Sequence, residues 1–334
     1  MSREFHALVL RRSADKKTIT RAIEKCRVSD LPAGDLLVRV HYSSLNWKDG
    51  LSCSGNPAVT RRFPHVPGID ASGTVVNSLV PEFKIGDFVV VAGTPLGTTV
   101  SGGFGQFISI PASWAVPLPQ SLTLRESMVY GTAGLTAALA IHRLQKIGLR
   151  PEGGPVVVTG ATGGVGCISV AILSKLGYDV TAVTGKLQEK EFLKSIGATT
   201  VLGREALGDT ASRPLLKEVW AGGVDSVGGL MLSALLKSCK VCGAVAATGL
   251  VASSELPITV MPFILRGVNL LGINTEALEM ELRAHLWSKL SKEWRPDRLD
   301  LIARECGLEK LDLEIDRIIA GLQKGRILLK MSEV

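Results

Sequence analysis

Aromatic residues are scarce in this chain of 334 residues, at 5% of the sequence. Few rings are therefore present to stack on exposed bases, as proteins that bind single-stranded nucleic acids require. The 38 Lys and Arg residues are scattered and form no basic arm. We expect no nucleic-acid partner, and the net charge of +7 fits a small anionic ligand better.

Long hydrophobic runs are also missing. No charge-free apolar stretch reaches the roughly 18 residues that a membrane-spanning helix needs, so we expect no membrane partner. The apolar piece Ala7–Leu10 near the N-terminus is too short for the core of a signal peptide. Six cysteines show no secreted-domain spacing, so we expect reduced thiols and a cytoplasmic location.

The sequence contains no cluster of metal ligands. A structural zinc site takes four closely spaced cysteines, and a catalytic one takes three Cys, His or Glu ligands with an open fourth position. Only Cys239 and Cys242 form a C-x-x-C pair, and no second pair accompanies them. We expect this pair to be structural and the protein to bind no metal. Internal repeats are missing too, which excludes solenoids and propellers.

The first 123 residues are rich in short β-like runs separated by Gly, Pro, Asn and Asp turns. Their density predicts an antiparallel, partly barrel-shaped domain. The runs are Ala7–Leu10, Leu36–Val40, Gly73–Val76, Phe88–Val91 and Phe107–Ile110.

The hydrophobic period changes after residue 123. Thr123 and Glu126 have the spacing of a capping box, and a helix is predicted from Met128 to Gln145. Strands and helices then alternate, which is typical of a doubly wound parallel sheet in an α/β domain. The predicted strands are Val156–Thr159, Val180–Val183, Thr200–Leu202 and Val241–Thr248, and the predicted helices are Gly163–Leu176 and Leu187–Ile196.

A third zone begins near Pro262. An apolar residue recurs at every fourth position along a predicted helix, at Leu278, Leu282, Leu286, Leu290 and Trp294. A second helix over Leu311–Leu322 precedes a terminal strand, Ile327–Met331. We therefore expect a dinucleotide-binding domain, residues 124–262, inserted into a catalytic domain made of residues 1–123 and 263–334.

The most informative motif is the glycine-rich segment from Gly160 to Gly166, which follows the apolar strand Val156–Thr159 and opens a helix. Such a turn lets the backbone approach a pyrophosphate, and the helix N-terminus offers free N–H groups. We expect Thr162, Gly163, Gly164 and Val165 to bind a dinucleotide. The alternative is a tight turn without a ligand.

The end of the next strand indicates which dinucleotide. A site that prefers NAD places Asp or Glu there to bind the ribose 2′-hydroxyl. This strand ends instead in Thr184, Gly185 and Lys186, and Arg204 follows the third strand. A hydroxyl and two cations suit a 2′-phosphate, so we expect NADPH as the cofactor. The alternative is a pair of solvated surface cations.

Several motifs along nearly the whole chain resemble the medium-chain dehydrogenase/reductase superfamily, in its zinc-free, quinone-oxidoreductase-like part, and more closely its acryloyl-CoA reductase branch. They span residues 42–49, 64–74, 131–137, 157–166, 224–228, 260–266 and 324–326. The resemblance implies a Rossmann domain within a GroES-like catalytic domain, and a homodimer that reduces acryloyl-CoA to propanoyl-CoA with NADPH. The cofactor contacts it implies are Trp47, Thr132, Thr162–Val165, Thr184–Lys186, Arg204, Leu250, Ile273 and Arg326.

Two positions of the resemblance bear on the chemistry. Zinc-bearing relatives have a cysteine ligand at the position of Asn46 and a histidine ligand within residues 68–70, and this chain has neither. The branch usually has tyrosine where this chain has Trp47, whose indole N–H donates a hydrogen bond but supplies no proton at neutral pH.

Reduction of a conjugated thioester places negative charge on the thioester oxygen, and donors preorganised there lower the barrier. We expect Asn46 and Trp47 to be the catalytic residues that position or polarise the acyl group, although Asn46 can equally cap a turn. Arg62 and Arg326 are candidates for CoA phosphates or carbonyls. Lys48 and Asp49 are expected to form a structural pair.

Two other functions remain open. The same fold can reduce quinones or enones, and a catalytically silent NADPH-binding protein would result if Trp47 closed the substrate channel. The basic pair Arg61 and Arg62 favours a CoA thioester as the substrate. The apolar run Val268–Ile273 is predicted to form an edge strand through which a second copy pairs.

Overall fold

The computed structural model describes residues 3–15, 18–207 and 213–332. The chain divides into two units, the first made of residues 1–135, 275–291 and 303–334, and the second of residues 136–274 and 292–302. Within the described ranges, no helix has the length and apolar character needed to cross a bilayer.

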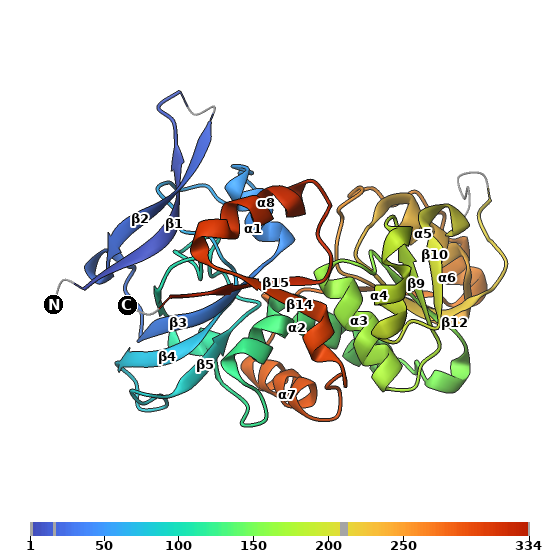
Figure 1. Ribbon diagram of the computed structural model, residues 1–334. Coiled ribbons are helices and arrows are strands. Elements are labelled where there is room, and N and C mark those ends of the chain that lie inside the picture. The colour runs from blue at the N-terminus through green and yellow to red at the C-terminus, as the bar shows by residue number, and fades with distance from the viewer. Residues whose placement is uncertain (1–2, 16–17, 208–212, 333–334) are drawn as a thin grey trace. The chain divides into compact units, whose positions relative to one another are not determined.

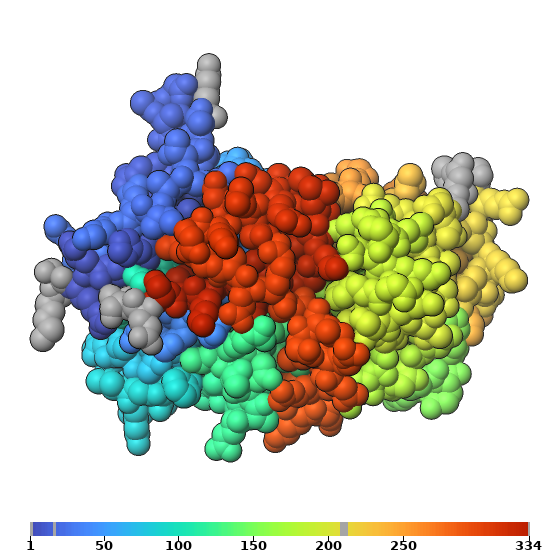
Figure 2. All heavy atoms as spheres, in the orientation of Figure 1, coloured from blue at the N-terminus to red at the C-terminus, as the bar shows by residue number. Residues whose placement is uncertain are grey.

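The first unit is mainly antiparallel β structure. Strands β1 (Glu4–Arg12) and β2 (Ile19–Arg27) form a hairpin whose turn end projects from the rest of the unit (Figures 1 and 2). A seven-stranded sheet runs in the order β14-β15-β3-β4-β5-β7, with β6 also paired to β3. Its strands are β3 (Leu36–Leu45), β4 (Ala71–Ser78), β5 (Phe88–Val91), β6 (Phe107–Ile110), β7 (Ala115–Pro117), β14 (Ala303–Cys306) and β15 (Arg326–Lys330).

The helices of the first unit close its core. They are α1 (Trp47–Cys53), α7 (Met280–Ser291), α8 (Leu311–Ile319) and the first part of α2 (Leu124–Lys146). The predicted capping box is confirmed, because Glu126 N donates to Thr123 Oγ1 at 3.1 Å and Thr123 N donates to Glu126 Oε2 at 2.9 Å. Of the predicted stripe, Leu278, Leu286 and Leu290 of this unit are buried, and so is Trp294 of the second unit.

The second unit is a parallel α/β domain. Its six-stranded sheet has the order β10-β9-β8-β11-β12-β13, with all paired strands parallel. The strands are β8 (Val156–Thr159), β9 (Val180–Thr184), β10 (Thr200–Gly203), β11 (Trp220–Asp225), β12 (Cys239–Ala247) and β13 (Asn269–Gly272). The helices are α3 (Gly164–Lys175), α4 (Lys190–Ser195), α5 (Gly229–Lys237), α6 (Met261–Arg266) and the rest of α2. The expected doubly wound sheet is confirmed.

The boundaries between the units lie at 135/136 and 274/275, beyond the expected 123/124 and 262/263. The beginning of α2 stays with the first unit because it is bonded there: Ser72 Oγ donates to Leu124 O at 2.8 Å. Residues 263–274 stay with the second unit because β13 extends its sheet beside β12. Residues 292–302 also belong to the second unit.

Candidate functional site

The order of the parallel sheet contains one point at which the winding direction reverses. Strands β8, β9 and β10 progress one way, and β11, β12 and β13 progress the other way, so β8 and β11 are neighbours. Ligands of open α/β sheets bind outside the carboxyl ends of the strands at such a reversal. The glycine-rich segment follows β8 at this place.

The glycine turn has the conformation that its sequence predicts. Gly160 has φ +58°, in the left-handed region that favours glycine. A Cβ on Gly166 would lie 2.3 Å from the carbonyl oxygen of Gly160, so the turn and the helix approach more closely than a side chain allows. Helix α3 begins at Gly164 with Gly163 as its N-cap residue. The first N–H groups of α3 are therefore arranged as in the helix N-termini that bind phosphates in other proteins.

Threonine hydroxyls join the glycine turn to the end of the next strand. Thr162 Oγ1 lies 3.2 Å from Thr184 Oγ1, and both side chains are buried. The backbone N–H of Lys186 donates to Thr184 Oγ1 at 3.0 Å, which fixes the turn at the end of β9. The structure thus brings together a residue that the sequence assigned to the glycine turn and one that it assigned to the 2′-phosphate.

Two cations meet beyond the end of β9. A Cβ on Gly185 would lie 2.4 Å from Cζ of Arg204, so the guanidinium lies directly against this glycine. Burial lowers the pKa of Lys186, and the charge of Arg204 lowers it further, whereas Glu189 acts in the opposite direction. The positive charge of Arg204 thus disfavours the charged form of Lys186, and a bound phosphate would favour that form.

The remaining predicted cofactor residues of the second unit lie at the same sheet edge. Leu250 follows β12 and is 65% exposed. Ile273 follows β13 and donates its N–H to Ala247 O at 3.0 Å. The carboxyl ends of β8, β9, β12 and β13 thus carry all the residues that the sequence assigned to the cofactor in this unit, with Arg204 just after β10.

In the first unit, a buried carboxylate organises the other predicted residues. Asp70 is fully buried, and its Oδ2 accepts hydrogen bonds from Asn46 Nδ2 at 2.7 Å and from Ser44 Oγ at 2.6 Å. Its Oδ1 accepts from the backbone N–H of Thr132 at 2.8 Å and from Thr132 Oγ1 at 2.6 Å. Asn46 and Thr132, which are far apart in sequence, therefore share one partner.

Arg326 completes this network. It is 1% exposed, and its Nη2 lies 3.5 Å from Asp70 Oδ2. The guanidinium also donates to Asn46 Oδ1 at 3.0 Å and to Ser44 Oγ at 2.7 Å. Further bonds go to the carbonyl oxygens of Leu45 and Val129. Arg326 thus lies inside the unit, and not on a surface where it would meet a CoA phosphate.

A break in helix α2 makes room for the network. Gly131 interrupts the helix with φ 51° and ψ −152°. A Cβ at this position would lie 2.3 Å from Asp70 Oδ2 and 2.6 Å from Ser44 Oγ. Glycine is therefore required here both for its conformation and for space, and the break lets Thr132 direct its N–H at the carboxylate.

Helix α1 holds the two residues expected to be catalytic. Asn46 is its N-cap residue and is 8% exposed, while Trp47 opens the helix and is 36% exposed. The Asn46 amide has partners on both atoms, Asp70 through Nδ2 and Arg326 through Oδ1. Its orientation is therefore fixed by the buried charges.

The expected pairing of Lys48 with Asp49 is wrong. Lys48 Nζ lies 2.5 Å from Glu276 Oε1. Asp49 is fully buried and accepts the backbone N–H groups of Asn46 at 2.8 Å, Gly68 at 3.1 Å and Ile69 at 2.9 Å. Successive helical residues point in different directions, which separates the two side chains.

The zinc-bearing relatives raise the question whether this centre fits a metal. Among the described residues, no three His, Cys, Asp or Glu side chains gather into a group that would hold one. The Asp70 carboxylate is bonded instead to hydroxyl, amide and guanidinium donors, and the positive charge of Arg326 would repel a metal cation. The residues present therefore do not fit zinc.

Sequence reasoning left Ser44, Asp49 and Asp70 out of the site. Ser44 and Asp70 lie within the motifs at residues 42–49 and 64–74, and Asp70 stands between the apolar residues Ile69 and Ala71. A buried polar group needs a partner, so such positions were a usable signal. Asp225 at the end of β11 was missed in the same way, because that strand was not predicted.

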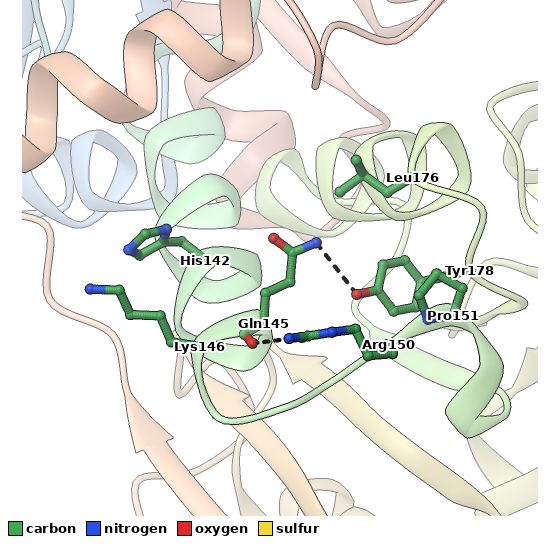
Figure 3. Close-up of a pocket in the computed structure, with 7 residues that line it drawn as sticks. All are labelled: His142, Gln145, Lys146, Arg150, Pro151, Leu176 and Tyr178. Carbon is green, nitrogen blue, oxygen red and sulfur yellow. Dashed lines mark hydrogen bonds between the residues drawn. The ribbon is translucent and has the colours of Figure 1, made fainter.

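A cavity of about 420 Å³ lies elsewhere in the second unit (Figure 3). It is lined by residues at the C-terminal ends of α2 and α3 and by Pro151, and none of the predicted site residues borders it. Arg150 Nη1 donates to the carbonyl oxygens of Gln145 and Leu149, so this cation caps the end of α2.

Comparisons with known sequences agree with this arrangement. The alcohol dehydrogenase GroES-like domain matches residues 32–120, and the zinc-binding dehydrogenase domain matches residues 164–292. Acrylyl-CoA reductase AcuI of Ruegeria pomeroyi is 42% identical, with 98% of this chain and 99% of that protein covered. YhfP of Bacillus subtilis, provisionally named a quinone oxidoreductase, is 44% identical, with 99% of this chain and 100% of that protein covered.

Solved structures give the same result. The yhdH oxidoreductase from Salmonella enterica, in complex with NADP, has a TM-score of 0.94 and 41% identity and covers 98% of this chain and 100% of its own. The YhfP structure with NAD bound has a TM-score of 0.95 and 44% identity, with the same two coverages. The chain is therefore an oxidoreductase and belongs to the medium-chain dehydrogenase/reductase superfamily, in its quinone-oxidoreductase-like part.

Proposed function

We propose that this protein uses NADPH to reduce the C=C bond of an α,β-unsaturated acyl-CoA, with acryloyl-CoA as the model substrate and propanoyl-CoA as the product. The choice of NADPH as the cofactor rests on Lys186 and Arg204. They lie near Thr184, at the end of a strand that bears no carboxylate. The substrate class is supported by the 42% identity to an acrylyl-CoA reductase over almost the whole chain.

The choice of NADPH over NADH is supported by this chain's own residues. Relatives have been solved with NADP and with NAD, so their ligands alone do not decide the matter. The hydroxyl of Thr184 and the two cations offer charge-assisted hydrogen bonds to a 2′-phosphate. The turn after Gly160 and the first N–H groups of α3 would hold the pyrophosphate.

When bound, NADPH would supply a hydride to the β-carbon of the thioester, and water would supply the proton for the α-carbon. The chain's task is to hold the acyl group and to stabilise the negative charge on the thioester oxygen. Loss of one preorganised donor to such an oxygen typically costs about 3–4 kcal/mol. We assign the positioning of the acyl group to Asn46 and Trp47. Both N–H groups of the Asn46 side chain are already donated, to Asp70 and to the carbonyl oxygen of Ser44, so the indole N–H of Trp47 is the donor that we assign to the thioester oxygen.

The competing acceptor is a quinone or enone, as the provisional name of YhfP suggests for that protein. Arg61 and Arg62 are both exposed and remain candidates for the CoA phosphates. A third reading, an NADPH-binding protein without catalysis, depends on Trp47 blocking access of the acceptor.

An acceptor assay tests the proposal. The purified protein is mixed with NADPH and then with acryloyl-CoA or a quinone, and the loss of nicotinamide absorbance is followed. We expect oxidation with acryloyl-CoA and formation of propanoyl-CoA. Oxidation with the quinone alone would support the second reading, and binding of NADPH without oxidation by either acceptor would support the third.

Lys186→Glu is expected to weaken NADPH binding about 10- to 100-fold and NADH binding far less. A hydrogen bond to a charged group contributes about 1.5–3 kcal/mol, and only NADPH carries the 2′-phosphate. The dissociation constants can be measured by quenching of protein fluorescence. The matched control is Lys194→Glu on the exposed side of α4. An equal loss for both coenzymes would refute the phosphate assignment.

We also propose that the protein forms a homodimer in the cytoplasm. All six cysteines are free thiols, as expected in a reducing compartment.

Strand β13 is an edge strand, and exposed apolar side chains lie near it on α6, among them Ile264 at 73% and Leu265 at 63%. Such an edge favours pairing with a second copy. Ile264→Glu is expected to shift the mass measured by light scattering from dimer to monomer, and an unchanged mass would exclude this surface.

A further inference from the structure

Hydrogen bonds join polar groups at the carboxyl ends of three neighbouring strands of the second unit, β8, β11 and β12. Thr159 and Asp225 are buried, and Ser226 and Thr248 are half-buried. We propose that Thr159, Asp225 and Ser226 are positioning residues that hold the glycine turn and the segment after β12 at the separation a dinucleotide requires. This inference rests on the proposed dinucleotide site, and it assigns residues outside the set predicted from the sequence.

The first tie joins β8 to β11. Thr159 Oγ1 donates to Asp225 Oδ1 at 2.6 Å, and both residues are fully buried. The same hydroxyl oxygen accepts the backbone N–H of Ser226 at 3.2 Å, and Ser226 Oγ donates to Thr159 O at 3.1 Å. Backbone hydrogen bonds alone keep parallel strands paired. These three bonds, each of which involves a side chain, therefore add a second constraint on the ends of the two strands.

The second tie supports the glycine turn itself. A Cβ on Gly160 would lie 2.4 Å from Ser226 Oγ, so this hydroxyl lies against the first glycine of the turn. Gly163 N donates to Gly160 O at 2.8 Å, which places the N-cap of α3 relative to that glycine. A shift of Ser226 would therefore move the turn and the start of the helix together.

The third tie reaches β12 and the segment that follows it. The backbone N–H of Thr248 donates to Asp225 O at 2.7 Å, and Thr248 Oγ1 donates to the same oxygen at 3.0 Å. A Cβ on Gly249 would lie 2.5 Å from Ser226 O, so the segment that leads to Leu250 lies in direct contact with the backbone of β11's end. Asp225 Oδ2 accepts the N–H of Gly228 at 2.8 Å and so closes its own turn.

A positioning role and a purely stabilising role predict different effects of removing the Thr159 hydroxyl on coenzyme affinity. Valine has the shape of threonine and keeps the β-branched strand, but it removes the hydroxyl that joins Asp225 and Ser226. The lost bonds lie under the glycine turn, so the binding of the coenzyme should weaken. A structural role alone would lower stability and leave the affinity of the folded protein unchanged.

The test compares Thr159→Val with Thr159→Ser, which keeps the hydroxyl, and with Tyr178→Phe. Tyr178 is also buried and donates its hydroxyl to Leu149 O at 3.1 Å, but it precedes β9 at the amino edge of the sheet. NADPH affinity is measured by fluorescence titration, and urea unfolding shows that each variant is folded. We expect Thr159→Val to weaken binding about tenfold and the other two to stay within about twofold.

Unchanged affinity in Thr159→Val, or equal losses in Thr159→Val and Tyr178→Phe, would overturn the inference. Should Thr159→Val not fold, Ser226→Ala replaces it, because it removes only the hydroxyl against Gly160 and is expected to weaken binding about threefold. A wild-type protein that binds no dinucleotide would instead refute the proposed function. Binding without reduction of any acceptor would refute only the reaction, and the affinity comparison would still decide the role of Thr159.

Discussion

Replacement of Arg326 by leucine is expected to lower the free energy of unfolding by about 3–5 kcal/mol, the usual cost of breaking a buried ion pair. Asp70 is fully buried and Arg326 is 1% exposed, so the leucine variant leaves a carboxylate inside the unit without its balancing charge. The variant also loses the donors to Ser44 and Asn46. Urea unfolding of both proteins measures the difference.

Arg11→Leu is the matched control for this variant. Arg11 pairs with Glu24 at 2.7 Å on the β1–β2 hairpin, but its side chain is 56% exposed. Such an exposed pair should contribute much less than the buried one, because water screens it and long side chains lose entropy when they pair. Equal effects of the two substitutions would contradict the importance of the buried pair. Asp70→Asn in the Arg326→Leu background should recover part of the lost free energy of unfolding, since it removes the buried carboxylate that has no balancing charge.

The stability of the protein is expected to fall as the pH rises from about 4 to about 7, through the titration of Asp49. Burial, followed by the negative charge of Asp70, raises the pKa of Asp49 to about 7. The unfolded chain has a pKa near 3.9, so between these values the folded protein holds a proton that the unfolded chain has released. Three pH units correspond to about 4 kcal/mol.

Asp49→Asn isolates this contribution. Asparagine is uncharged like the protonated acid, so the stability of the variant should lack this pH dependence. Its Nδ2 cannot accept the backbone N–H that one Asp49 oxygen accepts, so the variant should be less stable than the wild type at pH 4, and the difference should shrink by pH 8. Urea unfolding at both pH values gives the two slopes. Burial also lowers the pKa of His65, but that group is present in both proteins and cancels in the difference. Identical slopes would show that Asp49 does not titrate in this range.

The parts of the fold that follow from local pattern were predictable. Strand β8 and the start of α3 were predicted within a residue, because a β-branched apolar run meets a glycine turn. Strand β11 was not predicted, although it is central in the sheet, because Gly222 and Gly223 give it low β propensity. A Cβ at either glycine would lie 2.8 Å from a carbonyl oxygen, of Ala244 or Val157, so close strand packing explains both.

Strand β2 was missed for another reason. The apolar residues of its sequence, Ile19–Arg27, do not alternate with the polar ones, none of its side chains is fully buried, and its strand partner is β1 alone. The burial that usually marks a strand is therefore weak. Short α1 was missed as well, since its seven residues carry no repeated apolar spacing.

The grouping of the candidate site residues in space could be predicted in the second unit and only partly in the first. Thr184, Lys186 and Arg204 follow consecutive strands, so the parallel topology itself brings them to one edge. The Asp70 network depends on a contact with Arg326, 256 positions along the chain. No local sequence pattern predicts a contact between residues so far apart in the chain. The sequence therefore named Asn46, Thr132 and Arg326 without showing that one carboxylate binds all three.

The guanidinium beside Asp70 gives this centre a property that a metal ion would not. It is covalently part of the chain, so its occupancy cannot vary with the supply of an ion, and it cannot be exchanged for a competitor or stripped by a chelator. A guanidinium has no vacant coordination position and acts only through directed N–H groups. Any influence that it exerts on a substrate oxygen must therefore pass through hydrogen-bond geometry, which makes alignment, and not ligand exchange, the limiting requirement of the site.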